Sequence, residues 1–127
     1  VAEVCQEMIS DESLAARHEE IAMMAKSCKE RVVSKEMSIA ESYIRRGKKH
    51  SANQRIEKIK KEYVSENVEE YEPRVMYLEC KLAKSDNQDQ QAEQTLASMI
   101  DKYPESKYTK MAHGFITTRG ISELIHG

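Results

Sequence analysis

The sequence contains few of the residues that break helices or crosslink small domains. Among its 127 residues are four glycines, two prolines, three cysteines, one phenylalanine and no tryptophan. So little glycine and proline excludes collagen-like and low-complexity classes, and three cysteines are too few for a disulfide-dense scaffold. The first glycine is Gly47 and the first proline is Pro73. A long helix can therefore form in the opening third of the chain.

The chain also lacks an excess of either charge. Its 20 Lys and Arg residues oppose 22 Asp and Glu residues, which gives a formal net charge of −2. Without a global positive field the whole protein is not drawn to nucleic acid, so any charge-based function must be local. No apolar run approaches the roughly 18 residues of a membrane span. The opening residues VAEVCQEM have no initiator Met and none of the regions of a signal peptide, so we expect a fragment or mature piece.

The cysteines and methionines are better explained by a role in core packing than by metal binding or redox chemistry. Cys5, Cys28 and Cys80 form no CxxC pair, which argues against zinc binding and thioredoxin-type redox chemistry. Cys28 and Cys80 stand at apolar positions of helical patterns, where a small buried thiol is common. The methionines occupy similar positions, for example Met24, Met99 and Met111. We expect them to fill the core, and we expect no metal site and no cofactor.

Apolar residues recur at helical spacing along most of the chain. Between Leu14 and Arg46 they predict a first helix about 50 Å long, with cap candidates in the preceding SDES and a stop at Gly47. The stripe expected to be buried consists of Leu14, Ile21, Met24, Cys28, Val32, Ile39 and Tyr43. Further patterns predict helices over about 48–63 and 69–84, a helix after the SDNQD turn that ends at Pro104, and a last helix from Tyr108 that is interrupted at Gly120. Pro73 is expected in the first turn of its helix.

An internal repeat organises these helices. A shift by 40 positions superposes one part of the pattern on another without a gap: Ala52, Gln54, Ile56, Ile59 and Tyr63 on Ala92, Gln94, Leu96, Met99 and Tyr103. Two helices per unit at this period are typical of an α-solenoid. We therefore expect an all-α, right-handed α-solenoid of helical hairpins with one long helix. Residues 1–127 would form a single domain, with an upstream remnant over 1–12, repeats over 13–65 and 66–104, and a capping helix and tail over 105–127.

The first hairpin resembles a tetratricopeptide repeat. It carries Tyr43, a turn glycine at Gly47, a small Ala52 and then Ile56 and Ile59 along the packing face. The wider stretch KERVVSKEMSIAESYIRRGKKHSANQRIEKIKKEY, followed later by DKYPESKY, is similar to the middle repeat of the BamD family, the periplasmic lipoprotein component of the bacterial outer-membrane β-barrel assembly machine. The resemblance extends from about Ser13 to Ala112.

This resemblance implies a non-enzymatic scaffold that binds other protein subunits of the assembly complex, notably the last periplasmic domain of the barrel-forming subunit. It places the chain at the periplasmic face of the outer membrane of a Gram-negative bacterium, with a membrane anchor that is not part of this sequence. If the resemblance does not hold, the expected location is the cytoplasm.

Charge is distributed unevenly in the middle of the chain. Eight basic residues between 45 and 61 oppose one acid, Glu57, which gives this run a local charge of +7: Arg45, Arg46, Lys48, Lys49, Arg55, Lys58, Lys60 and Lys61. An acidic block follows, consisting of Glu62, Glu66, Glu69, Glu70 and Glu72. Such polarity steers partners and fixes their register. The alternative functions are a general helical-repeat adaptor or a nucleic-acid-binding helical domain that uses the basic run, although few aromatic residues interrupt that run.

Repeat proteins bind through the surfaces between repeats, which favours the start of the third predicted helix as the contact region. The candidate partner-binding residues are Glu70, Tyr71, Arg74, Arg45 and Arg46. Catalysis has little support, because the four histidines are scattered and no HExxH, GxSxG or phosphate-binding loop is present. We expect no enzyme activity and no small-molecule substrate.

Overall fold

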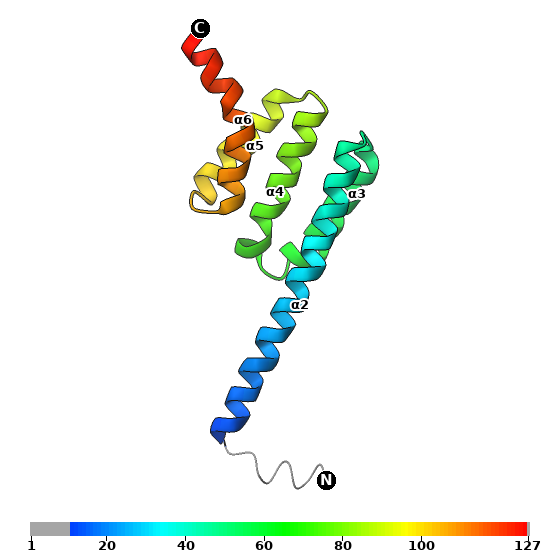
Figure 1. The fold of residues 1–127 in the computed structure, drawn as a ribbon, viewed down its shortest axis with the longest axis vertical. Coiled ribbons are helices and arrows are strands. Elements are labelled where there is room, and N and C mark those ends of the chain that lie inside the picture. Colours follow the sequence, from blue (N-terminus) through cyan, green and yellow to red (C-terminus); the bar gives the residue numbers. More distant parts are fainter. Residues whose placement is uncertain (1–10, 127) are drawn as a thin grey trace. The chain divides into compact units, whose positions relative to one another are not determined.

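The computed structural model describes residues 11–126, with side chains for residues 13–116. The helices are α2 (Asp11–Arg45), α3 (Lys49–Ile59), its π-helical continuation η1 (Lys60–Val64), α4 (Val68–Ser85), α5 (Asp89–Lys102) and α6 (Lys107–His126), as Figure 1 shows. Short turns join them, and residues 11–126 contain no strand. The prediction of an all-α fold is therefore confirmed over this range.

Contacts divide the chain into two units, residues 1–34 and 35–127. The first unit contributes residues 11–34 of α2 to the described structure, and side chains 13–28 are all exposed. The second unit contains the rest of α2 and the five elements that follow it. Except for Val33, the buried residues considered below belong to this second unit.

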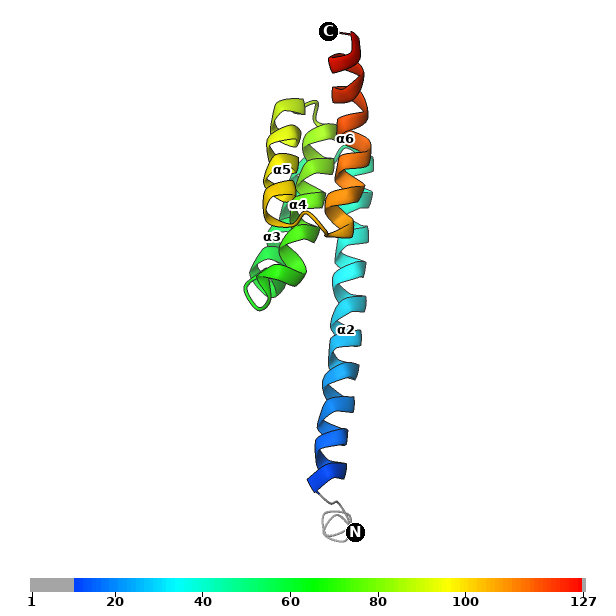
Figure 2. The same cartoon turned by 90° about the vertical axis from the view of Figure 1, so that its left-hand side faces the viewer.

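Helix α4 is the central element of the second unit. It contacts α3, η1, α5 and α6, and it lies between α3 and α5 in Figure 1, with α6 alongside in Figure 2. Among the residues with almost no exposed surface are Ile56 and Ile59 of α3, Val75 and Leu78 of α4, and Met99 of α5. The apolar side chains of several helices thus meet around α4, and their burial supplies the main driving force for folding.

Two turns with the same geometry close the two hairpins. Gly47, between α2 and α3, has a φ of 72°, and Asn87, at the equivalent place between α4 and α5, has a φ of 59°. In both turns the backbone N–H of the next residue donates to a carbonyl in the last turn of the preceding helix, at 2.8 Å from Lys48 to Tyr43 and 2.8 Å from Gln88 to Ala83. This is the αL helix ending that glycine, and less often asparagine, adopts with little strain.

The repeat inferred from the sequence is present in the structure of both hairpins. The end of α2 and the start of α3 recur at the end of α4 and the start of α5, with the same offset as the matched core positions. The apolar core positions Ile56 and Leu96 are buried, and Ala52 and Ala92 are fully covered. Small residues there let the two helices of each hairpin approach closely.

The buried face of α2 differs from the predicted stripe. The buried side chains are Val33, Met37, Ala40 and Ile44, whereas Leu14, Ile21, Met24 and Val32 are 44–68% exposed. The second-unit part of the helix therefore turns the neighbouring face inward, because α3 packs on the side marked by Glu36, which binds Arg55 and Lys58. The prediction that this stripe forms the buried face of the helix was wrong.

The prediction that the cysteines and methionines are buried is confirmed only in part. Cys80 and Met99 are fully buried, as predicted. Cys28 is exposed, Met24 is 68% exposed and Met111 is 47% exposed, so those three predictions were wrong. Cys5 lies outside the described residues. Helical spacing identifies an apolar face, but only packing against another element buries it.

Two helix boundaries also differ from the predictions. Pro73 lies inside α4 and not in its first turn, because the helix already begins at Val68, where the Asn67 side chain accepts a hydrogen bond from the Glu70 N–H at 3.2 Å. A proline in the second turn costs one backbone hydrogen bond, to the carbonyl of Glu69, and Glu69 is exposed to water. In addition, α6 continues through Gly120 to His126. A single glycine weakens a helix by about 1 kcal/mol and need not end it.

The two glycines at 47 and 114 predict opposite effects of one substitution. An added Cβ has open space at both positions, so only backbone conformation decides the result. Gly47→Ala should destabilise the fold by about 1 kcal/mol, because alanine resists a positive φ. Gly114→Ala, in the middle of α6, should stabilise it by up to about 1 kcal/mol. Urea unfolding curves of the two variants check both signs. A neutral Gly47→Ala would contradict the αL turn.

Candidate functional site

Arg74 is the charged side chain at the centre of the region selected from the sequence. Its Nη2 atom donates to Oε1 of Glu70 at 3.0 Å, one helical turn earlier in α4. The guanidinium group also lies over two tyrosine rings, at 5.2 Å from the centroid of Tyr71 and 5.5 Å from that of Tyr108. Only 7% of the side chain is exposed. Arg74 thus joins α4 to the first turn of α6 through cation–π contacts.

The turn between α5 and α6 holds Tyr108 in this position. The Thr109 hydroxyl donates to the carbonyl of Tyr103 at 2.7 Å, and the Tyr108 N–H donates to Oγ of Ser106 at 3.2 Å. The Tyr103 hydroxyl donates to Glu72 of α4 at 3.0 Å. Burial raises the pKa of the Tyr103 hydroxyl above its ordinary value, and the Glu72 carboxylate adds to the effect. The turn is therefore fixed to α4 by side-chain hydrogen bonds.

A groove runs over this junction between the start of α4 and the α5–α6 turn. We call it the α4–α6 groove; its lining residues are Glu69, Glu70, Pro73, Lys102, Tyr103, Pro104, Glu105, Ser106, Lys107 and Tyr108. Its volume is about 420 Å³, and it is largely open to solvent. Three carboxylates and two lysines surround proline and tyrosine rings. A groove with apolar rings and charges of both signs is suited to a protein segment.

The structure separates the five candidate partner-binding residues into two places. Glu70 lines the α4–α6 groove and is partly exposed, whereas Tyr71 and Arg74 are 4% and 6% exposed. Arg45 and Arg46 are exposed at the α2–α3 turn, the end of α3 remote from the α4–α6 groove (Figure 1). Arg74 pairs with a carboxylate of its own helix, Glu70.

Sequence reasoning missed the contribution of the α5–α6 turn to this groove. The sequence identified Pro104 only as the end of a helix and Tyr108 only as the start of the next, and Glu105 and Lys107 were not singled out. No local pattern could have selected them, because they reach the groove only when the turn packs against the start of α4, a segment distant in sequence. The remaining signal was the aromatic character of Tyr103 and Tyr108.

Half of the basic run is paired within the structure. Arg55 and Lys58 bind the same carboxylate, Glu36, at 3.1 and 3.2 Å. Lys60 lies 3.2 Å from Glu57 and 3.3 Å from Glu79. Arg46 donates to a backbone carbonyl and lies over the Tyr43 ring. Acids from α2 and α4 therefore offset much of the +7 counted along the sequence.

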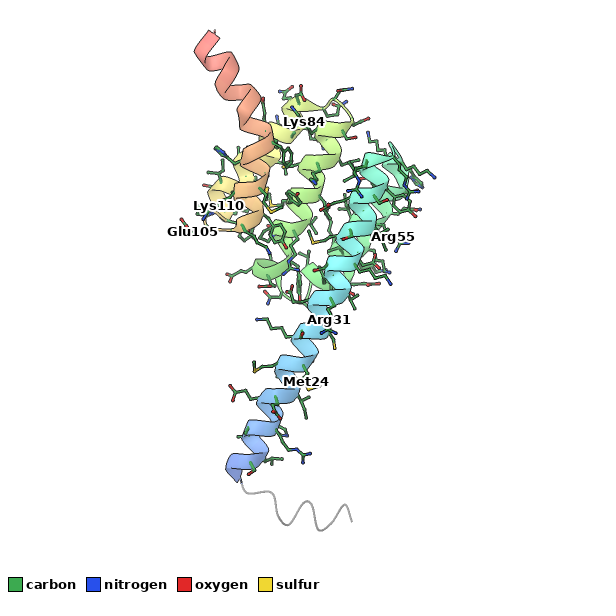
Figure 3. All side chains as sticks on the ribbon, in the orientation of Figure 1. Met24, Arg31, Arg55, Lys84, Glu105 and Lys110 are labelled. Atoms are coloured by element: carbon green, nitrogen blue, oxygen red, sulfur yellow. The ribbon has the colours of Figure 1, made fainter. Side chains whose placement is uncertain are left out.

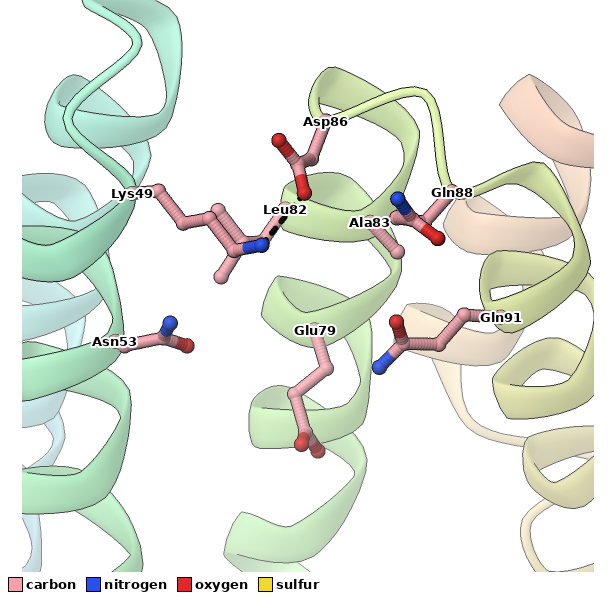
Figure 4. Close-up of a pocket in the computed structure, with 8 residues that line it drawn as sticks. All are labelled: Lys49, Asn53, Glu79, Leu82, Ala83, Asp86, Gln88 and Gln91. Carbon is pink, nitrogen blue, oxygen red and sulfur yellow. Dashed lines mark hydrogen bonds and ion pairs between the residues drawn. The ribbon is translucent and has the colours of Figure 1, made fainter.

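The fourth paired cation, Lys49, spans a smaller groove shown in Figure 4. Its Nζ lies 2.6 Å from Oδ2 of Asp86, the residue that ends α4. Asn53, Glu79, Leu82, Ala83, Gln88 and Gln91 complete the lining. The cation lies near the C-terminus of α4, where the helix dipole also favours positive charge. The ion pair links α3 to the turn of the second hairpin.

Glu36 is the most buried acid of the described core. Burial by itself raises the pKa of its carboxyl, but the hydrogen bonds from Lys58 and Arg55 outweigh burial, so the pKa lies below the ordinary value of 4.5. A lowered pKa in the folded state means that the ionised group stabilises the fold. That contribution is complete above the ordinary pKa and is lost as the pH falls through the folded value.

Cys80 has the environment of a packing residue. Its Sγ lies 3.8 Å from the carbonyl of Ala92 and 3.9 Å from Sδ of Met99. Burial raises the pKa of this thiol to about 12, and the charge of Glu79 adds to the effect. Because the thiolate is the reactive form, Cys80 is a poor nucleophile in the folded protein.

The described residues contain no cluster of side chains suited to metal binding, and their histidines do not gather at one site. His18, His50 and His113 are exposed on separate helices, and the side chain of His126 lies outside the described set. No group of three or more His, Cys, Asp or Glu side chains between residues 13 and 116 could hold a metal ion. No helix in the range searched is long and apolar enough to span a membrane.

Comparison with known proteins identified no relative of this chain. No family model matches the chain, and no curated protein or solved structure is significantly similar to it. The BamD-like assignment thus remains a prediction from the sequence motifs.

Removal of the Glu36 charge should make stability less dependent on pH. Glu36→Gln should lower the free energy of unfolding by about 1 kcal/mol at pH 7, because two hydrogen bonds to a carboxylate are weakened. At a second, acidic pH below the folded-state pKa of Glu36, the wild-type carboxyl is itself protonated, so the difference should shrink toward zero. Urea unfolding at both pH values measures it. Glu57→Gln, at an exposed single pair, is the control and should have little effect. A Glu36→Gln deficit that is equal at both pH values would refute the ion-pair account.

The two described thiols should differ strongly in reactivity. In a Cys5→Ser background, we expect Cys28 to react readily with Ellman's reagent at pH 8. Cys80 should react at least about 100-fold more slowly, because it must wait for local unfolding. Release of the coloured thiolate follows both rates, and added urea should remove the difference. Equal rates in the native protein would show that Cys80 is accessible.

Proposed function

We propose that this chain is a non-enzymatic scaffold that binds other protein subunits through the surfaces between its helical hairpins. The proposal rests on two hairpins that share one turn geometry and are related by the repeat of the sequence. An open groove of mixed charge lies beside them. Hairpins of this kind present side chains from several helices to one partner. The α4–α6 groove supports the proposal as the candidate surface for such a partner.

Contacts between α2 and α4 support the proposal of tetratricopeptide-like units. Equivalent positions of α2 and α4 face each other, since Glu41 lies 3.7 Å from Lys81, its counterpart in the next repeat. Close by, the Ser85 hydroxyl donates to the carbonyl of Ile44 at 3.3 Å. These contacts support a stack of the first helices of successive hairpins. A right-handed α-solenoid is the proposed architecture on this basis.

The proposed setting is the assembly of β-barrel proteins at the periplasmic face of the outer membrane. Its support is the BamD-like motif series that runs from KERVVSKE through IAESYIRRG to DKYPESKY. Under this proposal the partner is a protein subunit of the assembly complex, with the last periplasmic domain of the barrel-forming subunit as the first candidate. Glu70 is then the candidate residue that both lines the groove and can meet a basic group of the partner.

The contacts of the basic run weigh against nucleic acid as the partner. Four of its eight cations, Lys49, Arg55, Lys58 and Lys60, are already bound to carboxylates of the same chain. A phosphate backbone would have to displace those carboxylates or use the remaining cations alone. In the α4–α6 groove, by contrast, the Glu69 and Glu105 side chains are exposed and can meet a protein partner, although Glu70 and Lys102 are paired with Arg74 and Glu72.

Charge reversal in the groove should weaken partner binding without unfolding the protein. Glu69→Lys combined with Glu105→Lys changes two exposed positions and should reduce affinity for the periplasmic domains of the barrel-forming subunit at least about tenfold. Calorimetry or pull-down against the purified domains measures the effect. The control, Glu62→Lys with Glu93→Lys, makes the same change in net charge at exposed positions outside the groove.

Two results would overturn this function. One is a folded wild-type chain that does not bind the purified domains. The other is equal binding by the groove variant and its control, which would remove the groove from the interface. A salt-sensitive mobility shift of labelled RNA at physiological ionic strength would favour the nucleic-acid alternative instead.

A further inference from the structure

The first unit exposes an unusual share of the apolar surface. Eight large apolar residues of the described set are prominently exposed, and five of them lie between residues 14 and 32 of α2: Leu14, Ile21, Met23, Met24 and Val32. Met24 and Arg31 project from this part of α2 in Figure 3. Folded proteins rarely expose apolar side chains in such a group unless they serve an interaction.

Most of these residues share one face of the helix. At 100° per residue, Leu14, Ile21, Cys28 and Val32 fall within an arc of about 40°, and Met24 lies about 40° beyond it. Met23, although equally exposed at 67%, points to the opposite side. We call the shared face the α2 stripe. It is about 27 Å long, because Leu14 and Val32 are separated by 18 steps of about 1.5 Å.

Charges along the same segment are separated into two blocks. Residues 11–20 contain four acids and one arginine, while residues 26–34 contain three basic residues and one acid. The helix is thus acidic in its first half and basic in its second half. Two copies placed in parallel would bring like blocks together, whereas two antiparallel copies would bring opposite blocks together.

We propose that the α2 stripe pairs with the α2 stripe of a second copy of this chain in antiparallel orientation. The pair is centred near residues 23 and 24, so that the Leu14 end of one stripe covers the Val32 end of the other. Burial of the stripe supplies the attraction, and the opposed charge blocks set the direction. This interface is separate from the α4–α6 groove and does not depend on the function proposed for it.

Oligomeric state tests the contact with a matched pair of variants. We expect the full chain to dimerise with increasing concentration in sedimentation equilibrium. Ile21→Lys, on the stripe, should weaken the dimer at least about tenfold, because it places a charge in the apolar contact. Met23→Lys makes the same change in charge on the opposite face and should leave the dimer within about twofold. Ile21 is 61% exposed and Met23 is 67% exposed, so neither variant removes a core contact.

Salt and crosslinking test the direction. About 0.5 M salt should weaken an antiparallel pair, because it screens attraction between opposite blocks, and should strengthen a parallel one. In a Cys5→Ser background, the two copies of exposed Cys28 would face each other in a parallel pair and oxidise readily to a disulfide. In the antiparallel pair they lie about 15 Å apart along the axis, so the crosslink should form slowly. A His18→Cys variant in the same background should crosslink efficiently to Cys28 of the other copy.

Three outcomes would overturn the proposal. They are a chain that stays monomeric at about 100 μM, a dimer that Ile21→Lys and Met23→Lys weaken equally, and a rapid Cys28–Cys28 crosslink strengthened by salt. Circular dichroism of each variant establishes that the helices remain formed.

Discussion

The structure of the second unit depends on two turns that reverse the chain in the same way. In each turn the helix ends at a residue in the left-handed conformation, which lets the chain reverse sharply; that residue is Gly47 in one hairpin and Asn87 in the other. Each turn places an alanine, Ala52 or Ala92, where two helices approach closely. The hairpins then offer equivalent surfaces, and α4 can be contacted by α3 on one side and α5 on the other.

Once the hairpins are closed, charge mainly stabilises contacts within the chain. Glu36 lies between Arg55 and Lys58, and Lys49 reaches the end of α4 at Asp86. Each of these pairs joins different helices, so the basic run stabilises the packing of α2, α3 and α4. Of the charges in the α4–α6 groove, Glu70 pairs with Arg74 and Lys102 lies 3.7 Å from Glu72, whereas Glu69 and Glu105 are exposed. The pairing of the basic run within the chain supports the proposal of a protein partner over a polyanion.

The buried Arg74 shows how the site departs from expectation. The sequence made it a candidate partner-binding residue, but in the structure it lies beneath the α4–α6 groove and tyrosines from α4 and α6 cover its guanidinium group. These contacts fix Glu70 and Tyr108 at the groove. The groove residues of the α5–α6 turn could not be predicted, because their proximity to α4 depends on how three helices pack. The repeat, in contrast, was readable from five matched pairs of residues.

The sequence by itself determined the helical class, the approximate helix positions and the repeat of the hairpin, because these depend on local spacing and on rare helix-breaking residues. Only the tertiary structure decided which apolar face is buried. In α2 the buried side chains are Val33, Met37, Ala40 and Ile44, while the more regular stripe from Leu14 to Val32 remains exposed. The physical reason is that spacing defines where a face lies on a helix, whereas burial requires a second surface, and that surface comes from residues distant in sequence.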